Sequence, residues 1–262
     1  MKRNEITVIL AGYSYCYSGK ALLEMPEKDS HGNFFTRIER NKKFNGYELL
    51  VNQQARLFAR GSSTVASQHP FGRHAYRCSS LPSLFEGHSG QIRYYMEAKV
   101  DRPWKSDYKT RKPFTVNEII DINLPQYSTV PFGSEEKQIV GYLCRVAGNL
   151  TMQASRDRSG YSPGQHISLS ALCVNVSTLE MRSMRATLVQ RILYRLDDGH
   201  TVDVSYVIGS FEGERIPSRS QDLWNNRPFL IPPVPPTIRT KPVTVSYQVI
   251  FEVNVPWPWG KT

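Results

Sequence analysis

Apolar and polar side chains alternate along the stretch IRYYMEAKVD, which runs from Ile92 to Asp101. The apolar series is Ile92, Tyr94, Met96, Ala98 and Val100, and the intervening series is Arg93, Tyr95, Glu97, Lys99 and Asp101. A repeat of two residues is the pattern of a β-strand with one buried face. Pro103 follows, and because proline has no N–H to donate, it predicts the end of the ladder. We therefore expect an antiparallel strand here, with its apolar series in the core of a sheet domain.

Other parts of the chain show the same β-rich character. Strands are expected at 114–122, 165–176, 184–196, 200–211 and 243–255, and the opening MKRNEITVIL indicates a first strand rather than a signal peptide. Asp197-Asp198-Gly199 predicts a hairpin turn, because glycine accepts the positive φ of a tight turn. Residues 45–60 space their apolar residues as a helix does, but a strand is an equal alternative. Many short strands and few helices are typical of β-sandwiches.

Two strand-rich halves are separated by residues 123–138, where NLPQYSTVPFGSEEKQ combines proline, glycine and polar residues. This composition predicts a linker. The length of 262 residues suits two domains of about 100–150 residues each. We therefore expect an all-β chain of two tandem antiparallel immunoglobulin-like β-sandwiches, at residues 1–123 and 139–262, joined by a linker at 124–138. Residues 25–45 are polar and unpatterned, which predicts a loop or a partly disordered insert.

The net charge is +10, from 33 Lys and Arg against 23 Asp and Glu. Most of the excess lies in residues 1–125, which carry 19 basic and 12 acidic residues. This balance favours acidic partners, namely phosphorylated peptide, anionic lipid or nucleic acid, and it equally fits an inert basic surface.

Cys16, Cys78, Cys144 and Cys173 form no Cys-x-x-Cys pair, so we expect reduced thiols of a cytosolic protein. No apolar run reaches about 18 residues, so no transmembrane helix is expected.

Motifs that would indicate an enzyme do not occur in this sequence. No histidine lies at metal-ligand spacing from a cysteine or carboxylate, and there is no glycine-rich phosphate loop. Gly87-His88-Ser89-Gly90 departs from the Gly-x-Ser-x-Gly frame of a nucleophile elbow and opens a strand. We therefore expect no catalytic residues, no bound metal and no cofactor.

The basic and aromatic stretch KVDRPWKSDYKTRKPF, residues 99–114, is the main candidate for partner binding. The candidate anion contacts are Arg102, Lys105, Lys109, Arg111 and Lys112. In a nucleic-acid-binding protein such residues would neutralise phosphates while aromatic rings stack on bases. We favour a hairpin connection with solvated basic residues, in which Arg102 can serve packing.

IPPVPPT, residues 231–237, fits a polyproline ligand of WW or SH3 domains, but a fixed connection between strands is favoured.

Several stretches, taken in order, resemble the alpha-arrestins, or arrestin-domain-containing proteins. LFEGHSGQIRYYMEAKVDRPW, from Leu84 to Trp104, is similar to their N-domain pattern of a Phe-Glu-Gly turn, a strand and Arg-Pro-Trp. FTV at 114–116 and DIN at 121–123 resemble the last N-domain strand and the linker. The second half of the chain resembles the family's C-domain at SGYSPG (159–164), Trp224, LIPPVPP (230–236) and VSY (245–247). The resemblance covers residues 70–259.

Departures from the family pattern also shape the expectations. Residues 17–24 match an early N-domain strand loosely, and 25–68 hold no clear counterpart of the strand that follows it. The family's final C-domain strand, and its tail with Pro-Pro-x-Tyr motifs, find no match before Thr262. We therefore expect an N-terminal sandwich that is atypical over 25–68 and a C-terminal sandwich without its last strand. A sandwich that lacks a strand exposes ladder groups and apolar surface.

The resemblance implies a cytosolic adaptor that binds cytoplasmic segments of receptors or transporters and promotes their trafficking, endocytosis or ubiquitination. It also implies association with the plasma membrane or endosomes, through peripheral contact with anionic membrane. WW-domain ubiquitin ligases are further implied partners, although Leu124-Pro125-Gln126-Tyr127 is only a degenerate Pro-Pro-x-Tyr motif. Two alternatives stay open: a basic β-sandwich module that binds nucleic acid, which is the less favoured partner, and a retromer-type scaffold subunit.

Overall fold

The computed structural model describes residues 5–17, 27–28, 34–35, 46–59, 81–102, 106–140 and 146–256. Within these ranges the chain forms strands and a single 3-10 turn, η1 (Pro125–Tyr127). The predicted all-β class is therefore confirmed. No helix in the described part of the chain is long and apolar enough to cross a membrane.

The chain divides into two compact units, and each is treated separately. Unit 1 comprises Met1–Glu118, Ile192–Val204 and Pro236–Val245, and unit 2 comprises Ile119–Arg191, Ser205–Pro235 and Ser246–Thr262. Both units are therefore discontinuous in sequence. The domain boundaries expected from the sequence stay a prediction, and residues 132–138 of the expected linker form most of β8 (Phe132–Val140).

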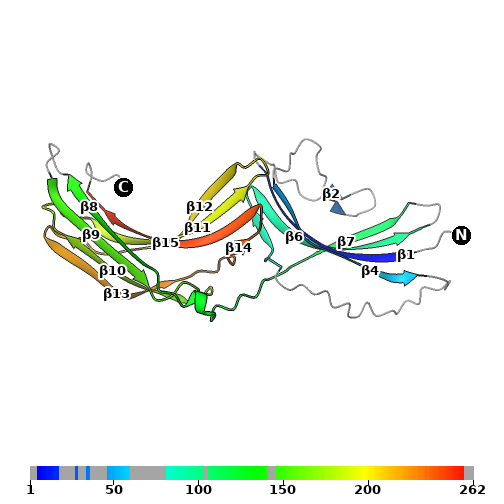
Figure 1. The fold of residues 1–262 in the computed structure, drawn as a ribbon, viewed down its shortest axis with the longest axis horizontal. Coiled ribbons are helices and arrows are strands. Elements are labelled where there is room, and N and C mark those ends of the chain that lie inside the picture. The colour runs from blue at the N-terminus through cyan, green and yellow to red at the C-terminus, as the bar shows by residue number, and fades with distance from the viewer. Residues whose placement is uncertain are drawn as a thin grey trace. The chain divides into compact units, whose positions relative to one another are not determined.

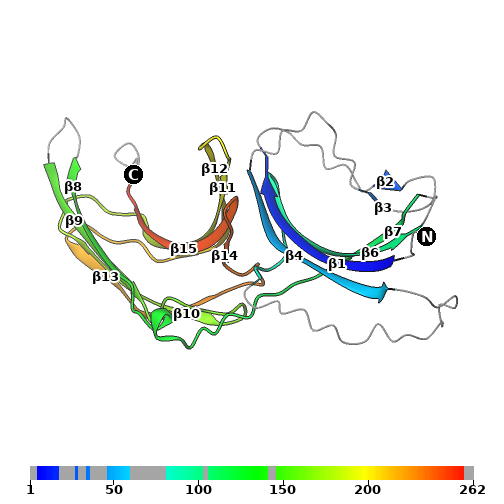
Figure 2. The ribbon, with the colours of Figure 1, turned by 45° about the vertical axis from the view of Figure 1, so that its right-hand side comes forward.

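Unit 1 is built on a five-stranded antiparallel sheet (Figure 2). Its strands are β1 (Glu5–Cys16), β4 (Gly46–Ala59), β5 (Phe85–Gly87), β6 (Gly90–Asp101) and β7 (Tyr108–Phe114). The order is β4-β1-β6, and β5 and β7 both pair with the outer edge of β6. A separate two-stranded sheet pairs β2 (Glu27–Lys28) with β3 (Phe34–Phe35), inside the region where the sequence predicts a loop.

β6 confirms the strand predicted from the alternation at 92–101. Ile92 and Tyr94 are buried, and the Tyr94 hydroxyl donates to the carbonyl of Pro82 at 2.7 Å. The expectation that the whole apolar series lies in the core is only partly right, because Met96 is 41% exposed and the last two members are half-buried. The alternation thus predicts the strand correctly and overestimates the extent of the core.

Residues 45–60 form a strand, so the helical alternative for them is wrong. β4 pairs with β1 from Gly46 opposite Cys16 to Ala59 opposite Glu5. The register shifts twice, and each shift leaves one extra residue on β4, first Leu50 and then Leu57. Because each bulge inserts a residue, the apolar positions lose their period of two and imitate a helical spacing.

The strand predicted at 114–122 is wrong in its placement. β7 ends at Phe114, opposite Tyr94, and residues 115–121 are outside any ladder. The reason lies on β6: β5 already pairs with residues 90–92, so it occupies the edge that residues beyond Phe114 would need. The carbonyl of Val116 instead accepts a hydrogen bond from the Leu84 N–H at 2.9 Å.

Unit 1 also contains two segments from the second half of the chain. The hydroxyls of Ser14 and Thr240 are buried and lie 2.9 Å apart, within hydrogen-bond distance. The Cys16 thiol donates to the Arg195 carbonyl at 3.1 Å. A Cβ built on Gly46 would lie 2.4 Å from that same carbonyl oxygen. Only glycine permits backbones to approach so closely, so the N-terminal sheet is shaped to receive these distant segments.

Unit 2 is a sandwich of two four-stranded sheets, which Figure 1 shows as separate layers. One sheet has the order β13 (Ser220–Leu230), β10 (His166–Asn175), β9 (Val146–Arg156) and β8. The other has the order β12 (Thr201–Glu212), β11 (Ser183–Arg195), β15 (Val243–Asn254) and β14 (Ile238–Arg239), with some of its residues counted in unit 1. β10, β11, β12 and β15 confirm the strands predicted from the sequence.

The core of unit 2 lies between these sheets. Trp224 is 1% exposed, and its ring meets that of Phe211 edge-on, with 4.9 Å between the centroids. Its Nε1–H donates to Asp222 at 3.1 Å, so the one polar group of the buried indole has a hydrogen-bond partner. Buried aliphatic side chains from both sheets, such as Leu169 and Met184, complete the same cluster.

Candidate partner-binding surface

β7 carries most of the basic residues that the sequence proposes as partner contacts. Its residues 108–113 are exposed, and β6 is its only strand neighbour within the described ranges. The register places Arg111 opposite Glu97, whereas Lys112 lies opposite Met96. Because side chains alternate along a strand, Lys109 and Arg111 point to one face of the sheet and Lys112 to the other.

Arg111 is held by two neighbours on its own face of the sheet. Its Nε donates to the Glu97 carboxylate, and its guanidinium carbon lies 4.8 Å from the centroid of the Tyr95 ring. The Glu97 side chain is 8% exposed, so the ion pair compensates the burial of that carboxylate. Burial lowers the pKa of Arg111, but hydrogen bonding and the charge of Glu97 outweigh it, and the pKa is raised overall. Arg111 is therefore a positioned and largely neutralised cation.

The remaining proposed contacts lie in different settings. Arg102 donates from Nε and Nη2 to the Ser106 carbonyl, at 3.0 and 2.6 Å, and so links the residue after β6 to the segment before β7. Lys105 lies outside the described residues. The structure thus brings Lys109 and Arg111 onto one face, places Lys112 on the other, and binds the Arg102 side chain to the Ser106 carbonyl. Their role as anion contacts stays a prediction.

Lys109 and Arg111 share their face with a group of tyrosines, which we name the tyrosine face. It comprises Tyr13, Tyr15, Tyr17, Tyr47 and Tyr95, from β1, β4, β6 and the residue after β1. Tyr13 stacks on Tyr15, with 5.6 Å between ring centroids, and meets Tyr95 edge-on at 5.9 Å. Burial raises the pKa of Tyr13, so its hydroxyl stays protonated at neutral pH. Tyr47 is 50% exposed and can reach a partner.

An arginine–carboxylate pair borders the tyrosine face. Arg93 lies opposite Tyr13, and it donates from Nε and Nη2 to the two Glu86 oxygens, at 2.7 and 3.1 Å. This hydrogen bonding raises the pKa of Arg93. The two-point contact holds the guanidinium in a fixed plane. Because tyrosine and arginine most often dominate protein–protein binding energy, the tyrosine face with Arg93 and Arg111 is our candidate binding surface.

Reasoning from the sequence missed this surface. One signal was present, because Tyr13, Tyr15 and Tyr17 recur with a period of two in the first strand. Tyr47 and Tyr95 could not be joined to them, since that requires the pairing of β1 with both β4 and β6. A single sequence does not supply that register.

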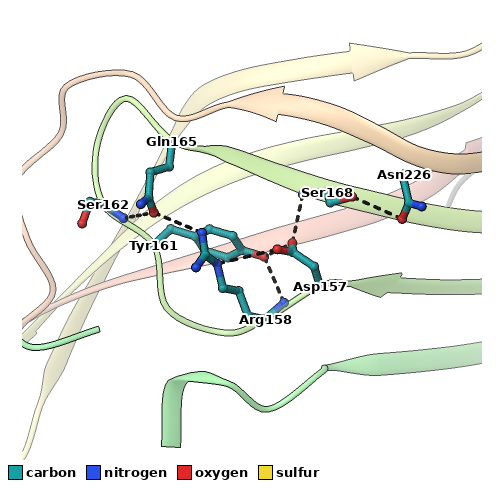
Figure 3. Close-up of polar contacts among 7 residues, drawn as sticks. All are labelled: Asp157, Arg158, Tyr161, Ser162, Gln165, Ser168 and Asn226. Atoms are coloured by element: carbon teal, nitrogen blue, oxygen red, sulfur yellow. Dashed lines mark hydrogen bonds and ion pairs between the residues drawn. The ribbon is translucent and has the colours of Figure 1, made fainter. Parts of the chain in front are cut away.

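A second polar cluster, in the turn between β9 and β10, has a structural explanation (Figure 3). Asp157 accepts hydrogen bonds from the Tyr161 hydroxyl at 2.6 Å and from the Ser168 N–H at 3.0 Å. Burial, together with the bond to Asp157, raises the pKa of Tyr161. A Cβ on Gly160 would lie 2.6 Å from the Cβ of Tyr127. The SGYSPG motif therefore fixes a tight turn against η1, and its polar groups bond one another.

The proline-rich segment 231–237 is hydrogen-bonded to other parts of unit 2 at Ile231 and Pro235, which supports the interpretation as a fixed connection. The Ile231 N–H donates to the Gln165 carbonyl, and the Ile231 carbonyl accepts from the Gly164 N–H, both at 2.9 Å. Further along, the Tyr247 hydroxyl donates to the Pro235 carbonyl at 2.6 Å. A segment held in this way is not presented as a free polyproline ligand.

The described cysteines are buried and unreactive. Cys16 and Cys173 are free and 0% exposed, and burial raises the pKa of each thiol to about 11. Such thiols are poor nucleophiles near neutral pH. Cys78 and Cys144 lie outside the described residues. Across the described ranges, no group of three or more His, Cys, Asp and Glu side chains could hold a metal ion.

Known proteins match both halves of the chain. Residues 14–123 match the family described as "Arrestin (or S-antigen), N-terminal domain", and residues 147–262 match "Arrestin (or S-antigen), C-terminal domain". These matches, with the all-β structure, confirm the predicted fold of two tandem β-sandwiches.

Individual relatives are similar over most of this chain. Arrestin domain-containing protein 17 of Caenorhabditis elegans is 34% identical over 262 residues, covering 97% of this chain and 60% of the relative. Arrestin domain-containing protein 4 of Mus musculus is 29% identical over 177 residues, covering 67% of this chain and 42% of the relative. Thioredoxin-interacting protein of Homo sapiens is 25% identical over 203 residues, covering 75% and 51%. The chain thus spans between 42% and 60% of the length of these relatives.

Proposed function

We propose that this chain, which belongs to the alpha-arrestin family, is an adaptor that binds cytoplasmic regions of membrane proteins. By binding receptors or transporters it would promote their trafficking, endocytosis or ubiquitination. The observation that supports this proposal most directly is the tyrosine face, flanked by Lys109 and Arg111 on one sheet of unit 1. A rigid surface of this composition suits recognition of a polypeptide.

The surface suits an extended segment that carries anionic groups. β7 has no described strand on its outer edge, so a peptide strand can add to its main-chain donors and acceptors. Lys109 would meet an anionic side chain or a phosphate, whereas Arg111 is already paired with Glu97. The tyrosine rings would supply apolar contact and hydroxyl groups to the same segment.

A first test compares charge reversal on β7 with charge reversal elsewhere. Lys109→Glu with Lys112→Glu should weaken binding to a phosphorylated cytoplasmic-tail peptide about tenfold or more, because two attractive charges become repulsive. Arg182→Glu with Arg239→Glu makes the same change in net charge at exposed residues outside β7 and should change binding little. Fluorescence anisotropy at constant salt measures both. Equal binding by the two double variants would remove β7 from the proposal.

A second test addresses the tyrosine face itself. Tyr47→Ala should weaken binding of the same peptide, because an exposed ring at an interface supplies apolar contact. Tyr206→Ala is the matched control, since Tyr206 on β12 is 44% exposed and Tyr47 is 50% exposed. If Tyr47→Ala binds as well as the control, the tyrosine face is not the contact surface.

A cytoplasmic location, with association to the plasma membrane or endosomes, belongs to the same proposal. Sedimentation with vesicles that contain or lack phosphatidylserine tests contact with anionic membrane. Single-stranded RNA bound as tightly, with a steep dependence on salt, would favour the nucleic-acid alternative instead. A stable stoichiometric complex in pulldowns would favour the retromer-type scaffold.

Direct recruitment of a WW-domain ligase is not part of the proposal. The degenerate motif ends in Tyr127, whose side chain packs against Gly160. The Tyr127 carbonyl also accepts the N–H groups of Ser159 and Gly160, at 3.0 and 3.2 Å. These contacts support a structural role for Tyr127 in the turn of unit 2.

A further inference from the structure

Side chains of the tyrosine face form a continuous line of contacts across the sheet of unit 1. The Tyr47 ring stacks on the Tyr13 ring, with 6.5 Å between the centroids, and Tyr13 meets Tyr95 at 5.9 Å. The guanidinium carbon of Arg111 then lies 4.8 Å from the centroid of the Tyr95 ring. These four residues come from β4, β1, β6 and β7, in the order in which the strands pair. We name this line of side chains the diagonal ridge.

The β4 end of the diagonal ridge is apolar and accessible. Tyr47 is 50% exposed, and Leu49, which lies opposite Tyr13 in the ladder, is 53% exposed. Because opposite residues in a ladder share a face, the Leu49 side chain lies on the same face as the ridge. Two large apolar side chains that are exposed next to each other favour contact with an apolar group of a partner.

The β7 end of the diagonal ridge carries one uncompensated positive charge. Lys109 lies opposite Lys99 in the ladder, and like charges directly opposite each other destabilise a strand pair. Lys99 is compensated by Asp107, at 2.9 Å, and Arg111 is compensated by Glu97. Lys109 forms no ion pair with any residue that the structure describes. An anionic group of a ligand placed at Lys109 would therefore relieve the repulsion between the two lysines.

The length of the diagonal ridge sets the spacing of these two contacts in a ligand. The three side-chain steps from Tyr47 to Arg111 span at most about 17 Å, and Lys109 lies two residues, about 7 Å, further along β7. An extended chain advances about 3.3 Å per residue, so it covers this distance in about seven residues at most. Side chains alternate in direction along an extended chain, so two that point to the sheet are an even number of residues apart. A separation of about six residues satisfies both conditions.

We propose that the diagonal ridge binds an extended acidic peptide that crosses the sheet, with an apolar residue on Tyr47 and Leu49 and a carboxylate on Lys109, about six residues apart. This inference rests on the proposed function and names the kind of segment that the tyrosine face recognises. One net positive charge matches one carboxylate, whereas a phosphate group carries nearly two negative charges and would leave part of them uncompensated.

A ligand that pairs with the outer edge of β7 would not make both contacts. It would lie beside Lys109, but β4 is three strand spacings, about 14 Å, away from β7. Its side chains would therefore not reach Tyr47. Contact with both ends requires a segment that runs across the strands, along the diagonal ridge.

The first experiment varies the spacing in a set of fluorescein-labelled peptides. All peptides have one composition, serine and glycine with one phenylalanine and one glutamate, and the two residues stand four, five, six, seven, ten or fourteen apart. Fluorescence anisotropy with the 262-residue chain should show the tightest binding at a spacing of six. Spacings of five and ten should bind about tenfold more weakly, because they do not engage both ends at once. An optimum at fourteen would indicate a helical ligand, which advances about 1.5 Å per residue, and would overturn the proposal.

Variants of the chain assign each end of the peptide to its contact. Lys109→Glu should weaken binding of the peptide with spacing six about tenfold, and a lysine in place of the peptide's glutamate should restore binding. Tyr47→Ala should weaken binding of that peptide, but not of a peptide with alanine in place of phenylalanine, because that peptide lacks the contact. Both substituted residues are exposed, so the fold is retained.

Lys112→Glu is the matched control. It makes the same change of charge on the same strand, but on the other face of the sheet, and should change binding less than about twofold. A ligand paired with the edge of β7 would respond to both lysines alike. Equal losses for Lys109→Glu and Lys112→Glu would therefore place the ligand on that edge and overturn the proposal.

Two further outcomes would also overturn the proposal. One is an affinity that does not depend on the spacing, and the other is no binding of any peptide at about millimolar concentration. If the chain then binds phosphatidylserine vesicles through Lys109, this face belongs to a membrane contact instead. A chain that binds the cytoplasmic-tail peptide without a preferred spacing keeps the proposed function and loses this inference. A chain that binds the peptide with spacing six, but no cytoplasmic-tail peptide, keeps this inference and loses the proposed function.

Discussion

Unit 1 and unit 2 are both built from β-sheets, but they hold their parts together by different physical means. Unit 2 packs two sheets around Trp224, with buried aliphatic side chains on every side. Unit 1 joins its N-terminal sheet to the segments 192–204 and 236–245. That junction relies on close backbone approach at Gly46 and on the buried contact between Ser14 and Thr240.

This difference determines which substitutions each unit tolerates. A core of large side chains loses stability chiefly through lost volume, because the cavity left behind is only partly filled. A junction of close backbones and paired hydroxyls loses stability through added volume or through one unpaired polar group. The two units should therefore respond to opposite kinds of substitution.

Trp224→Ala should have the largest effect, lowering the free energy of unfolding by about 3–5 kcal/mol, because it empties the centre of the core of unit 2. The neighbouring Leu223→Ala is the control, since Leu223 is 61% exposed and its truncation should change the free energy by less than about 0.5 kcal/mol. Urea titration measures both. Similar losses for the two variants would contradict the volume-based account of unit 2.

Gly46→Ala tests the opposite rule in unit 1. The added methyl group would collide with the Arg195 carbonyl oxygen, so the free energy of unfolding should fall by about 1–3 kcal/mol. Gly133→Ala is the control, because a Cβ there meets nothing within 4 Å. Thermal unfolding followed by circular dichroism compares the two. A neutral Gly46→Ala would show that the backbones can separate at no cost.

The two units also differ in how far the sequence predicts them. The strands at 165–176, 184–211 and 243–255, most of whose residues lie in unit 2, follow from long β-rich runs and one Asp-Gly turn. In unit 1 the prediction at 114–122 fails, since β5 occupies the edge of β6 beyond Phe114. Which strand occupies the edge of β6 depends on the tertiary structure, and a local sequence pattern does not contain that information.

The candidate binding surface illustrates the same limit. Lys109, Arg111 and Lys112 are visible in the sequence as a basic run, but their division between two faces depends on the register of β7 with β6. The tyrosine face draws on β1, β4 and β6, strands that lie far apart in the sequence and meet only in the sheet. Sequence pattern predicts strands and faces, and the pairing of strands decides which faces combine.

Thr240→Val should have a smaller effect in unit 1. The Thr240 hydroxyl donates to the Val243 carbonyl at 2.8 Å, so the proton between Ser14 and Thr240 comes from Ser14. The substitution removes the acceptor and leaves a buried hydroxyl unpaired, which should cost about 1–2 kcal/mol. Adding Ser14→Ala should recover part of that loss, because the unpaired Ser14 hydroxyl is then gone and only the Val243 N–H, which donates to the Thr240 hydroxyl at 3.1 Å, still lacks its acceptor. Strictly additive losses in urea titrations of the single and double variants would refute the pairing.

The smallest effect is a dependence on pH that the two units should share. Burial raises the pKa of Cys16 in unit 1 and of Cys173 in unit 2 from 9.0 to about 11. Each folded unit therefore binds its thiol proton more tightly than the unfolded chain does. The resulting stability is complete below about pH 9 and is lost as the pH rises toward about 11. Cys16→Ala and Cys173→Ala should each make the free energy of unfolding fall less steeply over that window, measured by urea titration against the parent chain. A thiol loses its proton in the same way in either unit. Equal slopes of the free energy of unfolding against pH, in the parent chain and in one variant, would therefore show that this cysteine ionises without opening the core around it.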